Sequence, residues 1–129
     1  MTGVTPLYAH ALAAETAATG SSSLDTRFVA SLAVDINVTA LTGGTSPTIQ
    51  FWVDRLGADS NWYNVWTSGT TGVAALYSVD IGAFSLNYSY PTTQAQHAVL
   101  TGTTRFRWAF GGTANPTSVT FSASVVGRG

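Results

Sequence analysis

Cysteine is absent from this chain of 129 residues, and so is lysine, because all five cationic side chains are arginines. Without cysteine there is no disulfide, thiolate metal site or thiol nucleophile, and such a small protein suits a reducing cytosol. Charged residues make up 9% of the chain, against roughly 25% in typical soluble domains. The net charge is −1, so the chain lacks the basic patch with which proteins neutralise nucleic-acid phosphates. We therefore expect no nucleic-acid partner.

Long apolar runs are also missing. Polar residues or glycine interrupt each apolar stretch well before the ~20 residues that a membrane-spanning helix needs. The first 20 residues lack a basic start, and His10 and Glu15 interrupt their apolar part, so they do not read as a signal peptide. We expect a protein made in the cytoplasm, with no membrane partner.

Alternation of apolar and polar residues is the strongest pattern that is present. Between Ser31 and Ala40 every second residue is apolar, which predicts a strand with one buried face. Further strands are predicted at residues 49–53, 62–66, 74–81, 84–90, 104–110 and 119–125. The segment 92–102 has no clear pattern.

Two similar glycine- and proline-containing segments, residues 43–48 and 111–117, each lie between two of these alternating runs. Glycine supplies positive φ and proline pre-sets φ, so each segment is expected to reverse the chain in a β-hairpin. Seven or eight short strands at spacings of about 10 residues favour an all-β fold, an antiparallel β-sandwich or jelly roll.

The N-terminal segment has a different composition. Residues 5–18 are rich in alanine, which favours helix, and Pro6 suits a first helical turn; an extended arm is the alternative. Residues 20–23 read Gly-Ser-Ser-Ser, as a flexible linker would. The sequence thus predicts an arm and linker at residues 1–23 and a β-sandwich domain at residues 24–129.

No residue set resembles a reaction centre or a metal site. The two histidines, His10 and His97, are far apart in the sequence and have no metal-ligand spacing. Asp54, Asp59 and Asn61 lie near one turn, where oxygen ligands could hold calcium, but their spacing is not that of an EF-hand loop. The six acidic residues are scattered, and a Gly-x-Ser-x-Gly nucleophile motif is absent. We expect no enzymatic activity, no cofactor and no metal.

Aromatic and arginine side chains are the candidates for a binding surface. Trp52 falls on the polar face of its strand, next to the inward Phe51, and is the best candidate for an exposed aromatic contact. Arg105 and Arg107 share a strand face; they could pair with carboxylates of a neighbouring subunit or form a solvated face within one subunit. A sugar-stacking platform is an alternative to core packing for four aromatic residues: Trp52, Trp62, Tyr63 and Trp66.

These strands and turns carry a family resemblance. It rests on residues 38–49 (Val-Thr-Ala-Leu-Thr-Gly-Gly-Thr-Ser-Pro-Thr-Ile), on Trp62 after an Asp-Ser-Asn turn, and on Arg105-Phe106-Arg107-Trp108 leading into the second turn. From about residue 31 to residue 127 the chain resembles small β-sandwich virion proteins of tailed bacteriophages. It departs from them in having a doubled glycine where a single one is expected.

The resemblance implies a capsid decoration (cement) protein that binds the outside of a phage head and bridges capsid subunits. Its partners would be the major capsid protein and copies of itself, with a homotrimer favoured, and it would carry no cofactor. An arm that becomes ordered on binding must bury apolar groups to offset the entropy it loses, and Leu7, Tyr8 and Leu12 would supply them. The alternatives are a phage tail or baseplate component and a carbohydrate-binding β-sandwich module.

Overall fold

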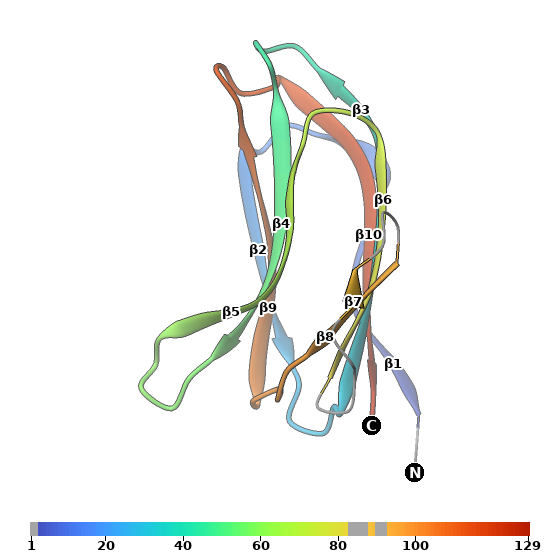
Figure 1. Cartoon of the computed structure of the whole chain (residues 1–129), viewed down its shortest axis with the longest axis vertical. Helices are drawn as coiled ribbons and strands as arrows, with labels where there is room; N and C mark the ends of the chain where they lie inside the picture. The colour runs from blue at the N-terminus through green and yellow to red at the C-terminus, as the bar shows by residue number, and fades with distance from the viewer. Residues whose placement is uncertain (1–2, 83–87, 90–92) are drawn as a thin grey trace.

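Alternating residues form two packed β-sheets in the computed structural model, which describes residues 3–82, 88–89 and 93–129. Figure 1 shows the sheets as two layers of strands. The all-β sandwich expected from the sequence is confirmed. The described strands are β1 (Val4–Glu15), β2 (Thr19–Asp25), β3 (Ser31–Thr42), β4 (Thr48–Leu56), β5 (Trp62–Thr71), β6 (Ala75–Gly82), β7 (Tyr88–Ser89), β8 (Thr93–His97), β9 (Thr103–Gly111) and β10 (Ser118–Arg128).

The six-stranded sheet has the order β1-β10-β3-β6-β8-β7, and the four-stranded sheet has the order β2-β9-β4-β5. Neighbouring strands are antiparallel except β6 and β8, which are parallel. Among the described strands, only β4–β5 and β7–β8 are neighbours both in the sequence and in a sheet. The chain therefore crosses repeatedly between the two layers.

The core lies between the inward faces of the two sheets. On β9, Phe106 and Trp108 are buried, and on β10 Phe121 is fully buried. The ring of Phe121 meets that of Phe51 on β4 at a centroid distance of 5.3 Å and that of Trp108 at 5.5 Å. Each large side chain buried in this way contributes about 1.5–3 kcal/mol to the free energy of unfolding.

The two similar turns occur where the sequence predicts them, but they do not close β-hairpins. The first joins β3 to β4 and the second joins β9 to β10, and in each case the two strands belong to different sheets. We call them the two arches. Thr45 in the first and Ala114 in the second exchange backbone hydrogen bonds of 3.1 and 3.0 Å, and both arches lie at the upper end of the sandwich in Figure 1. The turn residues account for the reversal of the chain, but they do not determine whether the two flanking strands pair with each other or lie in different sheets.

The N-terminal segment is part of the sandwich. Residues 4–15 form β1, which pairs with β10, so the helical alternative is wrong; the segment is extended, but as a strand of the sandwich and not as a separate arm. Residues 19–25 form β2, which pairs with β9 in unbroken register, so residues 20–23 are a strand and not a linker. The alanine-rich stretch is extended because pairing along β10 outweighs the intrinsic helix propensity of alanine.

The strand expected at residues 84–90 lies largely outside the described residues, which include only Tyr88 and Ser89 of it. The segment without a clear pattern, residues 92–102, contains β8.

Candidate functional site

The outer face of the four-stranded sheet carries the arginines singled out from the sequence. Along β9, buried and half-buried residues alternate strictly, so that Phe106 and Trp108 point into the core while Arg105 and Arg107 point outward. The arginine side chains are 25% and 31% exposed. This exposure places both guanidinium groups at the surface without leaving them fully solvated.

The neighbouring strand β4 places an aromatic ring and a carboxylate beside the arginines. Trp52 lies directly opposite Arg107 in the β4–β9 register, and Asp54 lies directly opposite Arg105. Side chains at such paired positions on one face of a sheet have Cβ atoms about 4.5–5.5 Å apart, and diagonal neighbours are also within reach of long side chains. Arg107 reaches Asp54 along the diagonal.

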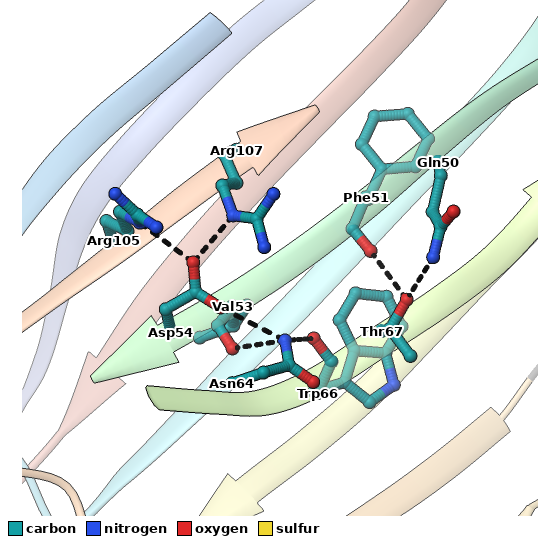
Figure 2. Close-up of polar contacts among 9 residues, drawn as sticks. All are labelled: Gln50, Phe51, Val53, Asp54, Asn64, Trp66, Thr67, Arg105 and Arg107. Carbon is teal, nitrogen blue, oxygen red and sulfur yellow. Dashed lines mark hydrogen bonds and ion pairs between the residues drawn. The ribbon is translucent and has the colours of Figure 1, made fainter. Parts of the chain in front are cut away.

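Asp54 is the centre of this arrangement. Its Oδ2 accepts hydrogen bonds from Nε of Arg105 at 2.8 Å and from Nε of Arg107 at 2.6 Å, while its Oδ1 accepts one from Nδ2 of Asn64 at 3.0 Å. Figure 2 shows the two arginines reaching this carboxylate from β9 and Asn64 reaching it from β5. Although Asp54 is only 1% exposed, both of its oxygens have partners.

The electrostatics of the cluster follow from these contacts. Burial by itself would raise the pKa of Asp54. Hydrogen bonds from both arginines and from Asn64 outweigh burial and hold the pKa below its ordinary value. Asp54 is therefore ionised at neutral pH, and one carboxylate faces two guanidinium groups, which leaves a surplus of one positive charge.

Each arginine also stacks on a tryptophan. The guanidinium carbon of Arg107 lies 4.2 Å from the ring centroid of Trp52, and that of Arg105 lies 4.4 Å from the ring centroid of Trp62. Stacking of this kind contributes about 0.5–1 kcal/mol at exposed sites and more where water is excluded. We call the surface made by Trp52, Asp54, Trp62, Arg105 and Arg107 the arginine–tryptophan face.

Irregularities in β5 bring Asn64 to the carboxylate. The β4–β5 register shifts between Val53 and Asp54 and again between Gln50 and Trp52, which leaves backbone groups without regular ladder partners. Polar side chains of β5 replace those partners. Asn64 donates to the carbonyl of Val53 at 3.3 Å, as well as to Asp54.

The second register shift is compensated in the same way. Ser68 Oγ accepts a hydrogen bond from the backbone N–H of Phe51 at 3.0 Å, and Thr67 Oγ1 donates one to the backbone carbonyl of Phe51 at 3.4 Å. Thr67 in turn accepts a hydrogen bond from Gln50, as Figure 2 shows. These contacts hold β5 against β4 and so fix the position of Trp62 at the start of β5.

The structure separates the six residues proposed as an interface into two groups. Trp52, Arg105 and Arg107 come together on the arginine–tryptophan face. Leu7 and Tyr8 belong to β1 and are partly buried against the chain's own core; the ring centroid of Tyr8 lies 5.2 Å from that of Phe106. Leu12 is 57% exposed and lies in β1 where its register with β10 shifts.

Sequence reasoning missed the role of Asp54, which it considered only as a calcium ligand. Its alternation with Trp52 placed it on the outward face, but the signal for its partners was the β4–β9 pairing, which the sequence does not reveal. Asp59 is separately engaged in the β4–β5 turn, where Tyr63 and the backbone of Asn61 donate to it.

His10 lies on β1, where its ring stacks on that of Phe121 at a centroid distance of 4.1 Å. Its Nδ1 donates to the carbonyl of Phe121 at 3.0 Å, and its Nε2 lies 3.2 Å from a carboxylate oxygen of Glu15. The contacts with Phe121 join β1 to β10, its neighbour in the six-stranded sheet.

The opposite outer surface, on the six-stranded sheet, has a shallow groove of about 620 Å³. Small residues of β1 and β10 line it, among them Ala9 and Ser124, together with the exposed Leu76 of β6. Its one acidic residue, Asp35, accepts a hydrogen bond from Ser78 at 2.8 Å. The two sheets thus present different outer surfaces, one with arginine and tryptophan side chains and the other with a groove of small apolar and polar residues.

Comparison with protein-family models, with curated proteins and with solved structures found no significant match. Among the described residues, no group of three or more histidine, cysteine or acidic side chains is arranged to hold a metal ion. The same part of the chain contains no helix long and apolar enough to cross a membrane.

Proposed function

We propose that this chain is a structural protein of a phage particle, a capsid decoration (cement) protein that binds the outside of the head and bridges capsid subunits. The observation that carries the proposal is the arginine–tryptophan face. Tryptophan and arginine are enriched among the residues that dominate binding energy at protein interfaces, and here two of each lie on one outer sheet face.

A bridging protein needs two surfaces that point in different directions. The arginine–tryptophan face and the groove of the six-stranded sheet lie on opposite outer surfaces of the sandwich, so one copy can contact two neighbours. The low charge of the chain, 9% of residues, limits repulsion between copies packed closely on a shell. The phage assignment itself rests on the sequence resemblance.

Phage particles assembled with and without this chain provide the test. Electron microscopy should show surface density that disappears without the chain, and heads that lack it should open at a lower temperature. Purified virions should contain many copies of it per particle. Few copies, confined to the tail, would assign it to a tail or baseplate instead, and unchanged heads would overturn the proposal.

The favoured oligomer is a homotrimer. Sedimentation equilibrium of the isolated protein should then give three times the 13.4 kDa mass of one chain. A mass that stays at one chain at all concentrations would contradict a trimer formed before the protein binds the head.

A further inference from the structure

We propose that the terminal guanidinium nitrogens of Arg105 and Arg107 form a receptor for a side-chain carboxylate on an acidic segment of a partner protein. The inference rests on the proposed function in one respect, which is that the partner is a protein. It assigns the chemistry of the contact, which the resemblance does not.

Unused hydrogen-bond donors are the first argument. Each arginine bonds to Asp54 through Nε, and no other described residue accepts a hydrogen bond from their terminal nitrogens. A guanidinium group has five N–H donors in a fixed fork that matches a carboxylate. Two such forks lie on one partly exposed surface, beside a carboxylate that engages only one donor of each.

Charge is the second argument. Two guanidinium groups against one buried carboxylate leave one positive charge, which one incoming carboxylate neutralises. Of the three remaining arginines, Arg27 pairs with Asp25, Arg128 lies on β10 in the other sheet, and Arg55 keeps its charge while donating to the carbonyl of Val99. A run of phosphates would bring far more negative charge than this face can balance.

Preorganisation is the third argument. Fixing a free arginine side chain on binding costs conformational entropy. Here the bond to Asp54 and the stacking on tryptophan have already ordered both guanidinium groups, so a ligand meets donors that need little further ordering.

The stacking also argues for a protein carboxylate over a neutral sugar. A sugar ring binds by lying on an aromatic face, but on this surface Arg107 lies over the ring of Trp52 and Arg105 over the ring of Trp62. Each tryptophan ring is thus already stacked against a guanidinium group, where a sugar ring would otherwise lie.

The test is a titration of the isolated protein with sodium glutarate at constant ionic strength, followed by the indole N–H signals in ¹⁵N-resolved NMR spectra. Trp52 and Trp62 should shift along a saturable curve with a millimolar dissociation constant. Trp66 and Trp108, which are buried in the core, serve as internal controls and should not shift.

Two arginine variants separate fork geometry from charge. R107K keeps the positive charge but loses the planar fork and the stacking, so it should bind glutarate at least about tenfold more weakly. R27K makes the same change at an exposed arginine outside the face and should bind like the wild type. Unfolding curves of both variants verify that they are folded, and R105K replaces R107K if the latter is not.

Four results would overturn the inference: absence of a saturable shift, equal shifts with sodium chloride, unchanged affinity of R107K, or tighter binding of phosphate or glucuronate than of glutarate. The proposed function can fail separately. If glutarate binds but the chain does not decorate phage heads, only the proposed function fails. If the chain decorates heads but does not bind glutarate, only the carboxylate receptor fails.

Discussion

Asp54 organises the arginine–tryptophan face, because it holds two guanidinium groups through a single carboxylate. A buried carboxylate with one missing partner would be costly, but three side chains donate to this one. The same contacts make it a structural residue, since β4, β5 and β9 all contribute to them. Replacing Asp54 should therefore change the stability of the fold as well as the arrangement of the arginine–tryptophan face.

We expect Asp54→Asn to lower the free energy of unfolding by about 2–3 kcal/mol at neutral pH, because charge-assisted hydrogen bonds are lost. Folding lowers the pKa of Asp54, so its ionised form stabilises the native state above the unfolded-state value of 3.8. This contribution is lost as pH falls through the lower native pKa. Urea unfolding should therefore show a difference between wild type and variant that shrinks below about pH 3.8.

Asp35→Asn is the matched control. Asp35 lies exposed on β3 and accepts one hydrogen bond from Ser78, so its replacement should change stability by less than about 0.5 kcal/mol. A difference between wild type and Asp54→Asn that stays constant with pH would contradict the role given to the ionised carboxylate.

Asp59 allows a second test at the level of one residue. The hydrogen bond from the hydroxyl of Tyr63 is the largest influence on it and, together with Asn61, lowers the pKa of Asp59 to about 2. Tyr63→Phe removes that donor, so NMR titration of the carboxyl carbon should show the pKa of Asp59 rise toward 3.8. An unchanged pKa would contradict this role of Tyr63 and would mean that the hydrogen bonds from Asn61 are enough to lower the pKa of Asp59.

At the scale of elements, the two arches hold the upper end of the sandwich together. Gly44 in the first arch has φ +75°, and a Cβ at this position would lie 2.5 Å from the carbonyl oxygen of Asn115 in the second. Only glycine combines that backbone conformation with so close an approach. The second of the two adjacent glycines in this arch thus has a structural reason.

Gly44→Ala should destabilise the protein more than Gly69→Ala does. Gly69 has nearly the same φ, +70°, but a Cβ added there would meet no atom within 4 Å. Gly69→Ala should thus cost only the backbone strain, about 1–2 kcal/mol, and Gly44→Ala should cost about 1–3 kcal/mol more through the clash. Thermal unfolding of the two variants measures this difference. Equal losses of stability would contradict the expected clash, because they would mean that the two arches move apart to accept the added methyl group at little cost.

The elements differ in how well the sequence predicts them. Residues 31–40 and 104–110 were predictable because each buries one face, which makes apolar residues alternate. The segment 5–18 was not, since alanine carries little alternation, and its strand structure comes from pairing with β10. Nor does a local turn signal distinguish a hairpin from an arch, because both need the same positive φ values.

At the scale of the whole molecule, fold class followed from strand spacing, whereas strand order did not. The arginine–tryptophan face combines residues from β4 and β5, which are neighbours in the sequence, with residues from β9, which meets them only through its long-range pairing with β4. Arg105, Arg107 and Trp52 could be recognised individually from their outward positions. The role of Asp54 as the common partner of the two arginines could not, because no local pattern specifies which strand lies beside β9.

The pairing of the first and last strands has a mechanical consequence. Val4 of β1 lies opposite Arg128 of β10, and Figure 1 shows the two chain ends at the same end of the sandwich. A load applied between the termini therefore opens this pair like a zipper, one hydrogen bond at a time. A load between Thr45 and Arg128 instead acts along β3 and β10 and must shear many bonds at once. Single-molecule pulling should find a clearly higher rupture force in the second geometry, so a load applied between the two termini acts along the weaker of these two directions.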